Sequence, residues 1–212
     1  MRPIRLAVVA LLAPVLLAAC FTGERPTFST GLADSNDPAV AAVLTLLDAV
    51  PAAPLTASYS LLTKFGNVTT PASVAIAAPG ERSITIGTIR FLLQAAGPHT
   101  CDLTVGRCSS TVDDAQVSDK SLTHDFYAAS AASRLRQDST TMVRPGLAST
   151  RLILDQTATC VEVAFTSGTK IYCALDNGLL AYQDTPDLQI TMLALTGTTD
   201  PAVFNPEATL GS

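Results

Sequence analysis

Residues 159–183 read TCVEVAFTSGTKIYCALDNGLLAYQ, and this stretch decides the fold. Apolar residues alternate with polar ones in 160–165, 170–175 and 179–183, which predicts three strands. Gly168 lies in the first connection, and Asp176-Asn177-Gly178 forms the second. Asn-Gly accepts the positive φ angles of a tight hairpin turn. The stretch therefore predicts an antiparallel meander.

Segments on either side extend this pattern. A helix is expected over 38–50, because Asp37 can cap it and Pro38 suits its first position. A second helix is expected over Leu122–Gln137, with Thr123 as its cap. Further strands are expected at Leu55–Leu61, at Val74–Ile76, at Ser83–Leu93 with a β-bulge at Gly87-Thr88, at His99–Ser110 as a hairpin, at Thr150–Leu154 and at Leu188–Leu195.

The order of elements is helix, strands, helix and further strands. Short connections favour an antiparallel sheet, and two inserted helices favour packing on one of its faces. The predicted fold class is α+β: a curved, unclosed antiparallel sheet, or half-barrel, packed over two or more helices. The half-barrel domain is expected over 37–196. Residues 20–36 are expected to form a flexible tether, and residues 197–212 a loosely ordered tail.

The N-terminal segment has the pattern of an export signal. Arg2 and Arg5 precede an uncharged apolar run over 6–19 that is short for a bilayer span. Leu17-Ala18-Ala19-Cys20 resembles the lipobox of bacterial lipoproteins. The resemblance implies a signal peptide at 1–19 and a lipid, such as palmitate, on Cys20. An ordinary secretory signal and an uncleaved anchor helix are the alternatives.

Composition limits the function classes. Without Arg2 and Arg5, the chain keeps 11 of its 13 basic residues against 18 acidic ones, a net charge of 11 − 18 = −7. This balance argues against a nucleic-acid partner. The 193 residues that remain of 212 after position 19 suit one domain with a sizeable core. We expect the membrane to be reached through the lipid anchor and the protein to be a monomer.

Four cysteines follow Cys20, namely Cys101, Cys108, Cys160 and Cys173. An even number in an exported domain indicates two disulfides, with three possible connectivities. Local pairing of the first two and of the last two is favoured, because antiparallel strands would bring each pair face to face. Zinc is the rival explanation, but these are not metal-ligand spacings and the chain has two histidines.

Residues that could carry catalysis are few. His124 is the best candidate base, with Asp125 adjacent and Ser121 nearby, but neighbouring residues on a helix point in different directions. His99 is expected in a loop. Asp113-Asp114 with Asp119 lack the alternating ligands and central glycine of a calcium loop. We therefore expect no enzyme activity, no metal and no cofactor.

A family resemblance rests on the lipobox and on three further segments, Ala57–Ser60, Thr159–Val161 and Ile171–Leu180. Together they resemble the actinobacterial lipoproteins of the LppX/LprG group and the wider LolA/LolB-like lipoprotein carriers. In that family a half-barrel wraps over helices and can enclose an apolar cavity for lipid chains. The resemblance implies a non-enzymatic carrier of lipid or lipidated molecules on the extracytoplasmic face of the cell membrane.

The inward residues of a curled sheet could line such a cavity or pack a solid core, and alternation predicts both equally. A structural or protein-interaction lipoprotein with a filled core is therefore the alternative function. The candidates for cavity lining are Tyr59, Leu61, Val74, Ile76, Ile84, Ile86, Phe91, Val161, Val163, Phe165, Ile190 and Met192.

Overall fold

The computed structural model describes residues 36–205. The expectations for the signal at 1–19, for Cys20 and for the tether up to residue 35 lie outside the described residues, as does the end of the tail at 206–212. Within the described part, no helix is long and apolar enough to cross a membrane.

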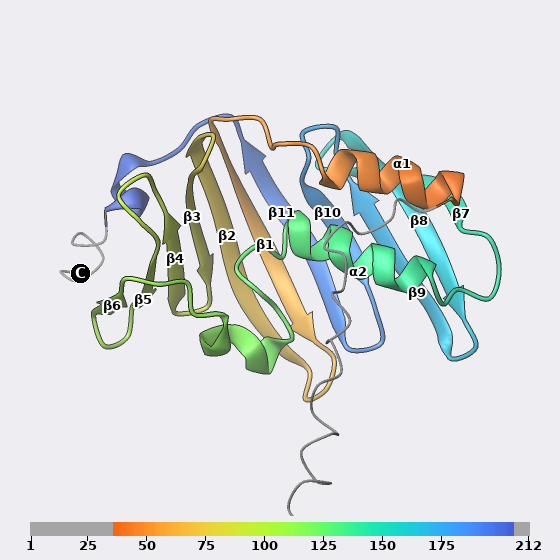
Figure 1. Cartoon of the computed structure of the whole chain (residues 1–212), viewed down its shortest axis with the longest axis horizontal. Helices are drawn as coiled ribbons and strands as arrows, with labels where there is room; N and C mark the ends of the chain where they lie inside the picture. Colours follow the sequence, from red (N-terminus) through yellow and green to blue (C-terminus); the bar gives the residue numbers. More distant parts are fainter. Residues whose placement is uncertain (1–35, 206–212) are drawn as a thin grey trace, which may run out of the picture. The chain divides into compact units, whose positions relative to one another are not determined.

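One antiparallel sheet of eleven strands forms the body of the protein (Figure 1). Its spatial order is β6-β5-β4-β3-β2-β1-β11-β10-β9-β8-β7, so sequence neighbours pair everywhere except where β1 meets β11. The strands are β1 (Leu55–Thr63), β2 (Val68–Ala78), β3 (Glu81–Ile86), β4 (Ile89–Leu93), β5 (His99–Asp102), β6 (Arg107–Ser109), β7 (Leu147–Ile153), β8 (Gln156–Phe165), β9 (Gly168–Ala174), β10 (Leu180–Asp184) and β11 (Leu188–Thr196).

Two α-helices cross the same face of this sheet, α1 (Pro38–Leu47) and α2 (Ala129–Ser139) (Figure 1). They contact each other, and α1 also packs on β7, β8 and β9. The sheet does not close, because β6 and β7 remain at its two ends. The structure thus confirms the curved half-barrel over helices. Two short 3-10 helices complete it, η2 (Asp114–Lys120) and η3 (Pro201–Phe204).

Asp37 fixes the start of α1. Its Oδ1 accepts hydrogen bonds of 3.0 Å from the backbone N–H groups of Ala39 and Val40. Its Oδ2 accepts one of 2.8 Å from Gly146, next to the start of β7. A Cβ at Gly146 would lie 2.9 Å from Asp37 Oδ1, so this close approach requires glycine. The helix ends at Leu47, three residues before the expected boundary.

Two expectations about local structure are wrong. Residues 83–93 do not form one bulged strand: β3 and β4 form a hairpin in which Ile86 pairs with Ile89, and Gly87 has a φ of +60°. The change of parity marks a turn instead of a bulge. The second helix begins at Ala129 and not at Leu122, and Thr123 donates a hydrogen bond to Asp125 instead of capping it.

The described part of the C-terminal tail is anchored through η3. Asp200 caps η3, and Phe204 is buried, while Ser83 donates a 2.8 Å hydrogen bond to the Val203 carbonyl. Residues 201–204 therefore form a short ordered helix inside the segment 197–212, which was expected to be loosely ordered as a chain terminus. The acidic segment after residue 112 forms η2, with Asp113 as its cap.

Both disulfides join residues that face each other across a strand pair. Cys101 on β5 bonds to Cys108 on β6, and Cys160 on β8 bonds to Cys173 on β9. These are the local pairs that the spacing favours. Each bridge links two adjacent strands near one end of the sheet order, so each holds an outer part of the sheet together.

Candidate binding site

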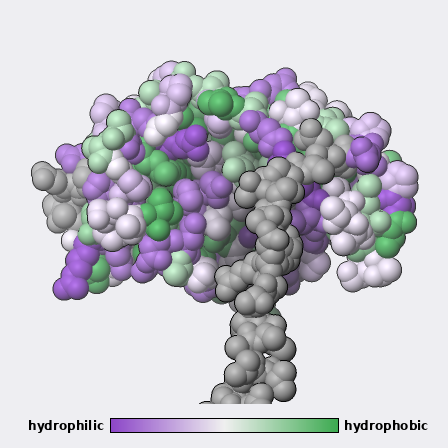
Figure 2. Space-filling view, in the orientation of Figure 1, coloured by the Kyte–Doolittle hydropathy of each residue, from purple (hydrophilic) through white to green (hydrophobic). Residues whose placement is uncertain are grey.

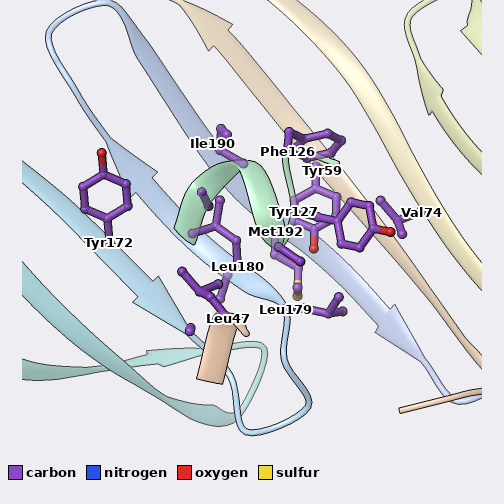
Figure 3. Close-up of a cluster of buried hydrophobic side chains, with 14 of the residues drawn as sticks. Leu47, Tyr59, Val74, Phe126, Tyr127, Tyr172, Leu179, Leu180, Ile190 and Met192 are labelled. Carbon is purple, nitrogen blue, oxygen red and sulfur yellow. The ribbon is translucent and has the colours of Figure 1, made fainter. Parts of the chain in front are cut away.

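The core lies between the sheet and the two helices, and the proposed lining residues belong to it. Eleven of the twelve are at most 2 % exposed, and Phe165 is half-buried against the same cluster. Figure 3 shows Tyr59, Phe126 and Met192 gathered in this layer with side chains from α1 and β10. In this structure the concave side of the sheet is filled by protein side chains.

A cleft opens where α2 ends above β9 and the β10–β11 turn. Its volume is about 460 Å³. Charged and polar groups dominate its wall, with Arg134 and Asp138 from α2 and Lys170 from β9. The other lining residues are Ser121, Gln137, Tyr172, Thr185, Pro186, Asp187 and Leu188. We call this the outer cleft.

A narrow crevice continues beneath α2. It does not admit a water molecule, and Arg134 borders both this crevice and the outer cleft. Its wall is mainly apolar and includes Phe126, Ala131 and Ile190, together with Leu122, Ser130 and Gln183. We call this the inner crevice. The charged outer cleft thus adjoins an apolar layer, with one arginine between them.

Asp138 holds the end of α2 on the sheet. Tyr172 donates a 2.6 Å hydrogen bond to Asp138 Oδ2, and Lys170 Nζ lies 2.6 Å from Asp138 Oδ1. A carboxylate near a helix C-terminus is unfavourable with the helix dipole, so these two donors offset that effect. Burial, and then the Asp138 carboxylate, raise the pKa of Tyr172 above its ordinary value.

The segment 121–128 covers the other side of the inner crevice. Leu122 and Phe126 are buried, and Arg134 donates a hydrogen bond to the Ser121 carbonyl. The Leu180 N–H donates one of 2.7 Å to the carbonyl of Tyr127. A few hydrogen bonds and four buried residues, with Tyr127 and Ala128 besides Leu122 and Phe126, therefore hold this segment over the sheet.

Two buried polar groups in the layer beneath this segment have no hydrogen-bond partner, Tyr59 Oη and Gln183 Nε2. Both residues are 1 % exposed, and the Tyr59 ring lies edge-on to Phe126 at 5.2 Å. Burial, and then the neighbouring Tyr127, raise the pKa of Tyr59. An unsatisfied buried polar group costs about 1–3 kcal/mol. The layer thus contains hydrogen-bonding capacity that the protein itself does not use.

Sequence reasoning included Tyr59 but missed Gln183. Gln183 shares its parity with the buried Leu179 and Ala181, and it pairs with Ile190 across β11. The available signal was therefore a glutamine at one of the alternating strand positions where buried apolar residues are expected. Arg134, Asp138 and Lys170 were missed because they are distant in sequence. Only the packing of α2 on β9 brings the first two beside Lys170.

His124 is not in a catalytic arrangement. Its Nδ1 lies 3.1 Å from both carboxylate oxygens of Asp114, whereas Asp125 accepts a hydrogen bond from Thr123. Across residues 36–205, no hydroxyl or thiol side chain is hydrogen-bonded to its ring. The same part of the chain contains no group of three side chains placed to hold a metal ion.

Comparisons with known proteins give a likeness in fold. No family model and no curated protein matches the chain. The fold is similar to that of LprF from Mycobacterium bovis, with 10 % sequence identity and a TM-score of 0.44 over 81 % of this chain and 99 % of that one. It is also similar to MucB, solved in complex with MucA(peri), with 9 % identity and a TM-score of 0.44 over 77 % of this chain and 57 % of that one.

Proposed function

We propose that this protein is a non-enzymatic lipoprotein of the cell envelope that binds lipid or a lipidated molecule beneath α2. The observation that carries the proposal is the pair of unpartnered groups, Tyr59 Oη and Gln183 Nε2, in an otherwise apolar layer. An ester or amide carbonyl is an acceptor that both groups could satisfy. Acyl chains joined to such a carbonyl match the rest of the layer.

The outer cleft suits the polar end of the same ligand. Arg134 and Lys170 supply positive charge, and Asp138 and Asp187 supply negative charge, so a polar head group finds donors and acceptors there. Arg134 stands where the head group would meet the acyl chains. Burial of apolar surface at about 25 cal/mol per Å² then supplies affinity without a specific contact for every carbon.

Binding requires α2 and the segment 121–128 to move away from the sheet, because the inner crevice is closed in this structure. The polar contacts with the sheet that must break are those of Tyr127 with Leu180 and Arg82, and those of Asp138 with Tyr172 and Lys170. The helix α2 and the segment 121–128 are thus the movable part, and the sheet, linked internally by two disulfides, is the fixed part.

We further propose that Cys20 carries the lipid anchor and that residues 1–19 are removed. Three apolar or small residues before the cysteine and two arginines near the N-terminus support this proposal. A two-chain anchor holds a protein on a membrane firmly, which a single chain does not. The protein would then act on the extracytoplasmic face of the cell membrane.

Purification of the full protein, followed by organic extraction without hydrolysis, tests the binding function. We expect about one non-covalent lipid per protein in the wild type and in the exposed control Gln156→Leu. We expect Gln183→Leu to lose most of this lipid. The leucine fills a similar volume, but the Nε2 group that would donate a hydrogen bond to the carbonyl of the ligand is gone. If the wild type yields no extractable lipid and takes up none from vesicles of bacterial phospholipid, the binding function is wrong.

The second candidate is a structural or interaction lipoprotein without a small ligand. The closed packing of the eleven buried lining residues favours it. The same experiment separates the two, since this candidate requires a protein that is free of extractable lipid and stays folded. Retention of wild-type lipid by Gln183→Leu would instead keep lipid binding and remove the role of Gln183.

A further inference from the structure

Strand β7 is an exposed edge of the sheet. It is the last strand in the spatial order and pairs only with β8. All its residues from Leu147 to Leu152 are exposed, and Leu147 and Leu152 are 56 % and 69 % exposed. Both faces of the strand are therefore accessible, together with the backbone groups along its outer side.

The two ends of the sheet differ in how they would resist another strand. At one end, β6 has three residues, and a disulfide ties it to β5. At the other, β7 has seven residues, contains neither proline nor lysine, and pairs with β8 in an unbroken register. Short strands, prolines, lysines and bulges are the usual protection of an edge. Strand β7 has none of these four, and its one charged side chain, Arg151, lies over the Tyr182 ring on the face of the sheet, so the edge is suited to pairing.

We propose that β7 pairs antiparallel with β7 of a second copy of this chain, across a two-fold axis at Thr150. The sequence of the strand is self-complementary in this register. Thr150 faces the partner's Thr150, and Ala148 faces the partner's Leu152. On the opposite face of the sheet, Leu147 meets the partner's Ile153. Paired threonines and paired aliphatic residues are favourable across antiparallel strands.

Charges do not oppose this register. Arg151 faces the partner's Ser149, and its guanidinium already lies 4.2 Å from the centre of the Tyr182 ring. Just before the strand, Arg144 is already paired with Glu162 of its own chain, at 2.9 Å, and so it adds no unpaired charge to this contact. No like charges face each other within the paired strands. The overall negative charge of the chain is therefore not concentrated at this edge.

The size of the contact sets its strength. One pair of seven-residue strands buries less than the roughly 1,200–2,000 Å² of a stable interface, so the dimer is weak in free solution. Confinement to a membrane raises the effective concentration of both copies and favours the pairing. This step rests on the proposed lipid anchor. A two-fold contact uses both β7 edges at once and so ends the assembly at two copies.

Charged substitutions of Thr150, the residue on the two-fold axis, test the proposal. Two forms of the full protein with different affinity tags are produced together and purified from membranes through one tag. Wild-type copies should co-purify, whereas Thr150→Lys with itself and Thr150→Glu with itself should do so about fivefold less, because like charges then face each other. Thr150→Lys with Thr150→Glu should recover the wild-type level. Thr150 is exposed, so the variants should keep the thermal unfolding midpoint of the wild type.

Cross-linking in membranes gives a second measurement. Thr150→Cys should form a disulfide-linked dimer under mild oxidation, because two-fold symmetry brings the two thiols together. Thr169→Cys is the matched control, since Thr169 is an exposed strand residue on β9, which lies two strands away from β7. Equal cross-linking of the two variants, co-purification that ignores charge at position 150, or no co-purification of wild-type copies would each overturn the dimer. A monomer that still contains extractable lipid would leave the proposed function intact.

Discussion

Tyr172 on β9 donates a 2.6 Å hydrogen bond to Asp138 near the end of α2, and this contact fastens the helix to the sheet beside the outer cleft. Tyr172→Phe should lower the free energy of unfolding by about 1.5–3 kcal/mol, because a buried carboxylate loses one of its donors. Urea unfolding of the full protein measures this loss. Tyr182→Phe is the control, because the Tyr182 hydroxyl is only half-buried, and its loss should cost less than 1 kcal/mol. Equal losses would mean that the Asp138 contact has no special role.

Stability should fall in alkaline solution. Burial is the first cause that raises the pKa of Tyr59, Tyr127 and Tyr172 above the ordinary value of 10.0. The contribution of these tyrosines to stability is therefore fully present below pH 10. It is lost as the pH rises toward their pKa values in the native state, because the unfolded chain releases these protons first. Each tyrosine contributes about 1.4 kcal/mol per pH unit in that range.

Unfolding by urea at several pH values above 10 measures this slope. Tyr172→Phe should reduce the slope by about one proton, because one of the buried tyrosines is then removed. A stability that is constant across this range in the wild type would contradict the assignment of buried, protonated tyrosines.

Tyr59→Phe should stabilise the protein without ligand by about 1 kcal/mol, since the unpartnered hydroxyl is removed and the ring contact with Phe126 remains. The same change should weaken lipid retention, because a donor to the ligand is lost. Thermal unfolding of delipidated protein and the lipid content of purified protein measure the two effects. A loss of stability in the delipidated protein would show that the hydroxyl has a partner there.

Local patterns predicted most of the sheet, and contacts distant in sequence explain the rest. Residues 159–183 form the expected strands, because alternation and the Asn177-Gly178 turn are properties of short segments. A parity change at Gly87 is compatible with a bulge or a two-residue turn, and only the pairing of Ile86 with Ile89 decides. The helix expected from Leu122 begins later, because the sheet buries Leu122 and Phe126 in an irregular segment.

The candidate site was predicted in part for the same reason. Inward parity identified Tyr59 and Ile190, which do lie beneath α2. The alternation of residues along a strand shows which side chains point inward but not what they contact. That the inner crevice is closed depends on the position of α2, which the alternation does not predict. The pairing of Asp138 with Lys170, 32 residues away in sequence, has no local signal at all.

The two disulfides should contribute unequally. Cys160–Cys173 spans 13 residues and Cys101–Cys108 spans 7, and the chain-entropy model gives the longer loop about 0.5 kcal/mol more. Cys160 and Cys173 are also buried, whereas Cys108 is exposed. Replacing Cys160 and Cys173 by Ala should cost about 3 kcal/mol, and replacing the other pair should cost less, both by urea unfolding. The opposite order would show that the β5–β6 hairpin matters more to the sheet than its size indicates.

Asp37→Ala should be among the most damaging single changes. Its carboxylate accepts hydrogen bonds from Ala39, Val40 and Gly146, so it both caps α1 and joins that helix to the start of β7. Loss of a cap costs about 1 kcal/mol, and a further unsatisfied N–H adds a similar amount, which predicts a loss of about 2–3 kcal/mol. Asp200→Ala is the matched control, because Asp200 caps the short η3 through Ala202 alone at an exposed site. Hydrogen exchange adds a local measurement: the amides of α1 and of Gly146 should lose protection together in Asp37→Ala, and Asp37→Asn should keep most of it, since its side-chain oxygen still accepts. Loss of protection in α1 alone would mean that the link to β7 does not depend on Asp37.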